Sequence, residues 1–203
     1  MYSVKETEGY MGAGGWEGCN SSRKGLYGAG LSKAIREEFR KNGIKGATIS
    51  CETYPGGQSV RIKLKVSEDD YVPFEEYRLK KWECINFIQF GDSFDYHGRK
   101  IDAWSCSHLP IKGRYSLYEK CLVEHYRKIH ELDPKYGLDI DKRYLGLYED
   151  RLSQAFLDKV RFVKKIVDSF NYDCSNAMVD YHDKGFCDTY TLIPAKKAKK
   201  EAA

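Results

Sequence analysis

The chain has 203 residues, of which 41% are hydrophobic and 32% charged, and its formal net charge at pH 7 is +4. This length suits one ordinary domain or two small ones. The composition excludes a membrane-spanning helix and a secretory signal, because no window approaches about 18 uncharged apolar residues and the N-terminus has no apolar stretch. We therefore expect a soluble protein with no membrane partner.

Residues 1–30 are rich in glycine and are expected to be irregular or extended. The segment contains neither of the two glycine patterns that bind nucleotide phosphates, so a structural loop is favoured over a nucleotide-binding one. A helix is predicted over residues 31–42, because Leu31, Ile35 and Phe39 recur on one face. Arg40 and Lys41 lie in the last turn, where the helix dipole favours cations, and Gly43 favours termination of the helix.

A β-hairpin is predicted over residues 46–66. Residues 46–54 and 58–66 alternate between apolar and polar side chains, as strands with one buried face do. The intervening Pro55-Gly56-Gly57 favours a tight turn, since glycine accepts a positive φ. One face of the second strand is apolar, and the other carries Arg61, Lys63 and Lys65.

The middle of the chain has weaker patterns. Residues 67–110 are acidic overall, with a candidate strand at 84–90 and a candidate hairpin at 94–104 turned at Gly98. Residues 114–131 repeat apolar side chains at helical spacing and are predicted to form a helix.

The longest predicted helix covers residues 151–170. Two short strands are then expected within residues 177–193, around Asp183-Lys184-Gly185, and the basic tail 195–203 is expected to be disordered. The apolar stripe of the long helix consists of Leu152, Phe156, Val160, Val163, Val167 and Phe170, widened by Ala155, Phe162 and Ile166.

Together these elements predict an α+β fold, with an antiparallel sheet built from hairpins and packed by two main amphipathic helices. The expected organisation is a Gly-rich N-terminal segment (1–30), a single α+β domain (31–194) and a disordered basic tail (195–203).

Seven cysteines occur at wide spacing and no C-x-x-C motif is present. An odd number without a secretory signal favours reduced thiols in the cytoplasm. A zinc site is the alternative, but the candidate ligands lack the paired spacing that zinc needs, and no metal or other cofactor is expected. Those candidates are Cys106, His108, Cys121, His125 and His130.

Two segments, 33–66 and 162–192, resemble a large polyvalent protein associated domain of the type found in phage, plasmid and conjugative-element proteins. The resemblance covers about a third of the chain; the type more often has Asp at the position of Asn176 and Phe at the position of His182. It implies a mobile-element origin and action in the cytoplasm of a bacterial host, and small proteins of that origin are often inhibitors of host defence, including anti-CRISPR proteins. The family has no catalytic set to transfer. The matching residues are Ala34, Ile35, Arg36, Phe39, Gly56, Gly57, Ser59, Asn171, Tyr172, Ser175, Asn176, Asp180, Tyr181 and Phe186.

Three groups of residues are candidates for function. A basic face could contact phosphate or an RNA-loaded nuclease, although charged side chains also belong on any solvated face. A glycine-rich turn could offer backbone N–H groups to an anion, or be a plain hairpin turn. Polar residues from Asn171 to Asp183 could form a metal or acid–base site, but capping and turn formation explain most of them. The basic face is Lys33, Arg36, Arg40, Lys41, Arg61, Lys63 and Lys65, and the turn is Gly56, Gly57, Gln58 and Ser59.

The sequence therefore predicts a non-enzymatic inhibitor of a bacterial defence system, above all an anti-CRISPR protein that binds a nuclease complex or its DNA or RNA. The alternative is a nucleic-acid-binding accessory protein of the mobile element. A metal-dependent hydrolase is disfavoured, because no ligand cluster or catalytic motif occurs.

Overall fold

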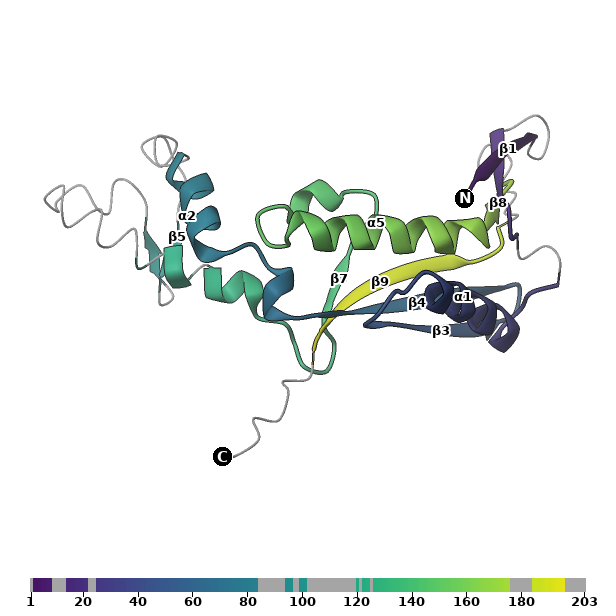
Figure 1. The fold of residues 1–203 in the computed structure, drawn as a ribbon, viewed down its shortest axis with the longest axis horizontal. Helices are drawn as coiled ribbons and strands as arrows, with labels where there is room; N and C mark the ends of the chain where they lie inside the picture. Colours follow the sequence, from purple (N-terminus) through teal and green to yellow (C-terminus); the bar gives the residue numbers. More distant parts are fainter. Residues whose placement is uncertain are drawn as a thin grey trace, which may run out of the picture. The chain divides into compact units, whose positions relative to one another are not determined.

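The structure is a computed structural model in which the chain divides into two compact units (Figure 1). Unit 1 comprises residues 1–67, 133–145 and 154–203, and unit 2 comprises residues 68–132 and 146–153. Each unit is described by itself. The residues described are 2–8, 14–21, 25–83, 94–96, 99–101, 120, 122–124, 126–175 and 184–195.

The first helix and the hairpin form where the local pattern predicts them. Helix α1 (Ala29–Lys41) buries Leu31, Ile35 and Phe39, and the chain leaves it through Gly43, whose φ of 66° suits a helix end. Strands β3 (Ala47–Tyr54) and β4 (Gly57–Val66) then pair antiparallel through eight residue pairs.

The larger sheet is mixed, and in this respect the prediction of an antiparallel, hairpin-built sheet is wrong. Its strand order is β3-β4-β9-β7. Strand β9 (Cys187–Pro194) runs parallel to β4, and β7 (Leu138–Ile140) runs antiparallel to β9. A parallel neighbour requires a long crossover, and part of that crossover here is helix α5 (Gln154–Ser169). The fold class itself is α+β, as expected.

Helix α5 packs against the sheet through its apolar stripe. The predicted stripe is wrong at Phe162, which is 39% exposed and meets the ring of Tyr2 edge-on at 6.1 Å between centroids. Ala155 is also exposed. The buried apolar residues of α5 are Phe156, Leu157, Val160, Val163, Ile166 and Val167.

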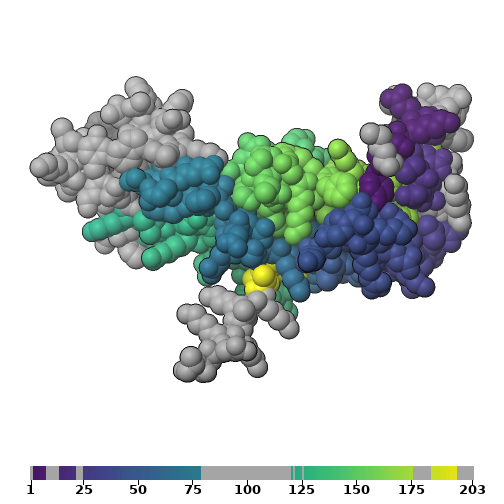
Figure 2. All heavy atoms as spheres, viewed as in Figure 1, coloured from purple at the N-terminus to yellow at the C-terminus, as the bar shows by residue number. Residues whose placement is uncertain are grey.

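Both helices cover the same face of the larger sheet. Along β4 every second residue is buried, from Val60 to Val66, while Arg61, Lys63 and Lys65 between them are exposed. A helix on the face that carries Arg61, Lys63 and Lys65 would bury those three side chains. Helices α1 and α5 therefore lie together on the face that carries the buried residues of β4. Figure 2 shows α5 and α1 adjoining at the surface. The apolar core of unit 1 therefore lies between this helix layer and one side of the sheet.

Part of the glycine-rich N-terminal segment is extended. Strands β1 (Val4–Glu8), β2 (Gly14–Gly18) and β8 (Tyr172–Asp173) form a three-stranded antiparallel sheet. Gly18 marks its closest approach to the end of α5, where its N–H donates to Asn171 O at 2.9 Å.

Replacing Gly18 with alanine should lower the free energy of unfolding by about 2–3 kcal/mol. A Cβ at this position would lie 2.3 Å from the carbonyl oxygen of Ser169 and 2.4 Å from that of Asp168, so the backbone would have to move. Gly14→Ala in the same strand is the matched control, because no atom lies within 4 Å of its Cβ position. Urea unfolding followed by circular dichroism compares the two; equal midpoints would contradict the prediction.

Unit 2 contains the short helix η3 (Glu68–Asp70), helix α2 (Phe74–Glu83) and the antiparallel strands β5 (Phe94–Tyr96) and β6 (Arg99–Ile101). The two strands confirm the arms of the predicted hairpin, although its turn at Gly98 lies outside the described residues. The described part of the helix predicted over 114–131 is helical up to His130. The hydrophobic core of unit 2 contains Val72, Tyr77 and Leu122, and Phe74, Tyr126 and Ile129 pack against them.

His130 is half-buried in unit 2 beside two tyrosine rings. Its ring centroid lies 4.4 Å from that of Tyr71 and 3.9 Å from that of Tyr126, and its Nε2 lies 3.2 Å from Arg151 O. Burial disfavours the charged imidazolium and lowers the pKa of His130 below its ordinary value.

Unit 2 should accordingly lose stability on mild acidification. The unfolded histidine takes up a proton near pH 6.5, whereas the folded one does so at a lower pH, so the unfolded chain binds more protons as the pH falls through that window. An NMR titration should place the pKa of His130 below its ordinary value of 6.5, and amide exchange of Tyr126–His130 should accelerate as the pH falls from about 7 to about 5.5. A titration midpoint at or above the ordinary value contradicts this.

Several predicted features lie outside the described residues. They are the candidate strand at 84–90, the first of the two strands expected within 177–193, and the tail beyond residue 195. Within the described part of the chain, no helix is long and apolar enough to cross a lipid bilayer.

Candidate nucleic-acid interface

The face of the larger sheet opposite α1 and α5 carries a row of exposed basic side chains. Alternation along β4 directs Arg61, Lys63 and Lys65 away from the helices, and all three are exposed. Alternate residues of a strand are about 6.6 Å apart, so the three cations are spaced over about 13 Å. We call the side of the sheet opposite α1 and α5 the open face.

Hydroxyl groups flank this row on both neighbouring strands. The strand register places Thr48 and Ser50 of β3 beside Lys63 and Arg61, and Thr189 and Thr191 of β9 on their other side. Hydroxyls donate and accept hydrogen bonds without carrying charge. The open face therefore combines cations, hydroxyls and two carboxylates, Glu52 and Asp139. Its cations and hydroxyls are suited to contacts with phosphate and sugar.

The free positive charge of the open face is concentrated at Lys63 and Lys65. Arg61 forms a salt bridge with Glu52 of β3, and the Thr191 hydroxyl donates to Asp139 Oδ1 at 2.6 Å. Neither Lys63 nor Lys65 has a salt-bridge partner among the described residues. Two ammonium groups thus remain available to an anionic ligand.

The basic residues of α1 do not extend this surface. The helix packs on the other side of the sheet, and its Arg36 reaches over the edge strand β3 to donate to Ile49 O at 3.3 Å. Lys41 pairs with Glu38 at 2.6 Å, whereas Lys33 and Arg40 are exposed. The structure therefore separates the seven predicted basic residues into two groups on opposite sides of the sheet.

The glycine-rich turn proves to be an anchoring point within the fold. Gln58 is 3% exposed; its Oε1 accepts from Gly28 N at 2.9 Å, and its Nε2 donates to Gly185 O at 3.3 Å. Gly56 has a φ of 87° directly after Pro55, the arrangement of a type II turn. Gln58 is thus committed to internal contacts and cannot serve as an anion ligand. Of the four predicted turn residues, Gly57 and Ser59 lie on the open face.

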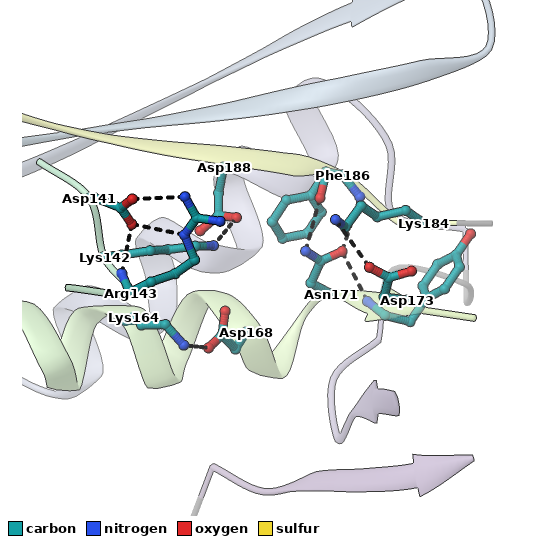
Figure 3. Close-up of polar contacts among 11 residues, drawn as sticks. Asp141, Lys142, Arg143, Lys164, Asp168, Asn171, Asp173, Lys184, Phe186 and Asp188 are labelled. Carbon is teal, nitrogen blue, oxygen red and sulfur yellow. Dashed lines mark hydrogen bonds and ion pairs between the residues drawn. The ribbon is translucent and has the colours of Figure 1, made fainter. Parts of the chain in front are cut away.

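The polar segment after α5 is used mainly to hold β9 in place (Figure 3). Asn171 is 2% exposed, and its side chain bonds both backbone groups of Phe186 at 2.9 and 3.0 Å. Asp173 accepts from Ser175 N at 3.2 Å and pairs with Lys184 at 3.1 Å. Desolvation acts to raise the pKa of Asp173, but these hydrogen bonds outweigh it and hold the pKa below its ordinary value.

No metal site emerges from the candidates that the structure describes. The described residues contain no group of three or more His, Cys, Asp or Glu side chains that could share a metal ion. Asp180, His182 and Asp183 lie outside the described residues, as do all the zinc candidates apart from His130.

The sequence patterns missed one buried ion pair, between Lys142 and Asp188 (Figure 3). The Asp188 side chain is 5% exposed because it shares the core-facing side of β9 with Tyr190 and Leu192. Burial, followed by the charge of Asp188, raises the pKa of Tyr190 well above its ordinary value. The sequence signal for this pair was that Asp188 alternates with Tyr190 and Leu192, and so falls on the apolar side of its strand.

Comparison of the chain with protein-family models, with curated proteins and with solved structures finds no match.

Proposed function

We propose that this protein is a non-enzymatic inhibitor from a phage or other mobile element, and that it docks on the nucleic acid of a bacterial defence nuclease complex. The single observation that carries the docking step is the open face. There Lys63 and Lys65 have no salt-bridge partner among the described residues, and threonine and serine hydroxyls lie on the neighbouring strands. The mode of action is that of an anti-CRISPR protein.

Phosphate is the ligand chemistry that this face fits best. Lysine is a mobile point charge that contacts phosphate without demanding one geometry. Neighbouring threonine and serine hydroxyls can bond phosphate and sugar oxygens, and such backbone contacts fix the position of a nucleic acid without reading its sequence. A protein partner would have to match the same pattern with carboxylates.

The inhibitory role is supported by the sequence resemblance to mobile-element proteins over residues 33–66 and 162–192. The open face supports equally the second candidate, a nucleic-acid-binding accessory protein of the element, because its available groups suit phosphate whether or not a nuclease is present. The inhibitor would bind nucleic acid held by a nuclease complex, whereas the accessory protein would bind free nucleic acid.

A cleavage assay distinguishes them. Purified CRISPR and restriction nucleases are given DNA with and without this protein, and gel shifts of the same free DNA are recorded over a salt series. Inhibition of at least one nuclease supports the inhibitor. Tight, salt-sensitive binding to free nucleic acid with every nuclease fully active supports the accessory protein. If the protein neither inhibits nor binds, the open face is only a solvated surface.

A further inference from the structure

We infer that the open face binds single-stranded rather than duplex nucleic acid, laid along β4 with a base stacked on Tyr54. This inference rests on the proposed function and names its ligand class. Three features of the face carry it: its width, the aromatic rings at one end, and the distance between those rings and the lysines.

The width of the sheet argues against insertion into a duplex groove. At Lys63 the sheet is four strands wide, since Lys63 pairs with Thr48 and Thr191, and Thr191 with Asp139. Three gaps of about 4.8 Å place the outer backbones about 14 Å apart. The major groove is about 12 Å wide and admits a helix or a two-stranded ribbon, so this face can reach only the outside of a duplex.

An exposed aromatic ring occupies one end of the row. Tyr54 is 46% exposed and lies on the open face, in step with Glu52 and Ser50 along β3. A Cβ on Gly57 would lie 2.9 Å from Tyr54 Cε2, so the absence of a side chain at Gly57 lets the ring lie over β4. The Tyr54 hydroxyl is 3.4 Å from Gln58 O, and this contact orients the ring before any ligand binds.

A second ring lies at the same end of the hairpin. Tyr27 is 54% exposed, and its hydroxyl donates to Gly57 O at 2.8 Å. Bases inside a duplex are already stacked on one another, whereas the bases of a single strand are free to stack on an exposed aromatic side chain. Rings at the end of a basic row therefore favour a single strand.

The distance along β4 from Tyr54 to the two lysines suits an extended nucleic-acid strand of several nucleotides. Gly57, beneath Tyr54, and Lys65 are eight residues apart on the same face of β4, a span of about 26 Å. Ser59 and Arg61 lie between them, and Arg61 is engaged by Glu52. Lys63 and Lys65 are thus the phosphate contacts, and two such contacts predict a salt slope of about −1.4 for a single strand.

The test measures fluorescence anisotropy of labelled oligothymidylate, alone and paired with oligoadenylate. The single strand should bind about tenfold more tightly than the duplex, with the salt slope given above. Tyr54→Leu, which still covers Gly57, should weaken single-strand binding about tenfold, while Tyr54→Phe should retain it. Tyr144→Leu, at another exposed tyrosine of unit 1, is the control and should change nothing.

The outcomes separate this inference from the function on which it rests. Equal affinity for the duplex, or full binding by the Tyr54→Leu protein, overturns single-strand recognition and leaves phosphate docking intact. Absence of binding to both ligands overturns the proposed function itself. Thermal melting of each variant verifies that binding is compared between folded proteins.

Discussion

Reversing the charge of both free lysines, in the Lys63→Glu/Lys65→Glu double variant, should weaken binding to single-stranded nucleic acid at least about 25-fold at 0.1 M salt. Each phosphate that a lysine no longer neutralises lowers the slope of log affinity against log salt by about 0.7. Two such phosphates lower the slope by about 1.4, which at 0.1 M salt corresponds to a loss of affinity of about 25-fold. The substituted side chains also repel phosphate, which weakens binding further. Anisotropy titrations over a salt series measure both the affinity and the salt slope.

The matched control is Lys33→Glu/Arg40→Glu on α1. It changes the net charge of the protein by the same amount, and both side chains are exposed, but they lie on the other side of the sheet. Screening by salt limits the influence of distant surface charges, so this variant should bind within about threefold of the unaltered protein. An equal loss of affinity in both variants would show that only net charge matters and that the open face is not the interface.

Stability should depend on Asn171 more than on any other polar side chain described. Asn171→Ala removes the amide that accepts from Tyr172 N and Phe186 N, at 2.9 and 3.0 Å, and donates to Phe186 O at 2.9 Å. Each backbone group left unsatisfied in a buried site costs about 1–3 kcal/mol, so we expect a decrease of about 3 kcal/mol or more in the free energy of unfolding.

The control for this prediction is Asn20→Ala. Asn20 is exposed, and the one side-chain hydrogen bond described for it joins its Nδ2 to Ser169 Oγ at 3.2 Å, near the same end of α5. Its replacement should cost less than about 1 kcal/mol. Urea unfolding gives both values, and similar decreases for the two variants would refute a special role for Asn171. Because Phe186 directly precedes β9, the Asn171 variant should also weaken nucleic-acid binding by disturbing the parallel pairing with β4.

Asn171, one of the residues on which the predicted resemblance rests, has a structural role in this fold. Its amide connects the end of α5 to the start of β9, and the parallel strand pair depends on that connection. Asn171 therefore serves the fold without needing to touch any ligand. Gln58 also has a structural role. Its place beside the turn predicted an anion contact, but its side chain instead hydrogen-bonds Gly28 N and Gly185 O.

The local elements of this protein were determined by the sequence itself. Apolar residues at helical spacing specified α1 and most of α5, and strict alternation with Pro55-Gly56 at the turn specified the β3–β4 hairpin and the exposure of Arg61, Lys63 and Lys65. These features depend on interactions within a few residues, which a period and a turn reveal.

Only the tertiary structure decided which of these elements meet. The parallel pairing of β9 with β4 joins residues more than a hundred positions apart, and no local pattern encodes that choice. The tertiary packing also placed both helices on one side of the sheet, and so divided the predicted basic residues between two surfaces. Asp188 was buried for the same reason: its exposure depends on the layer packed above its strand, which a single strand's own sequence does not contain.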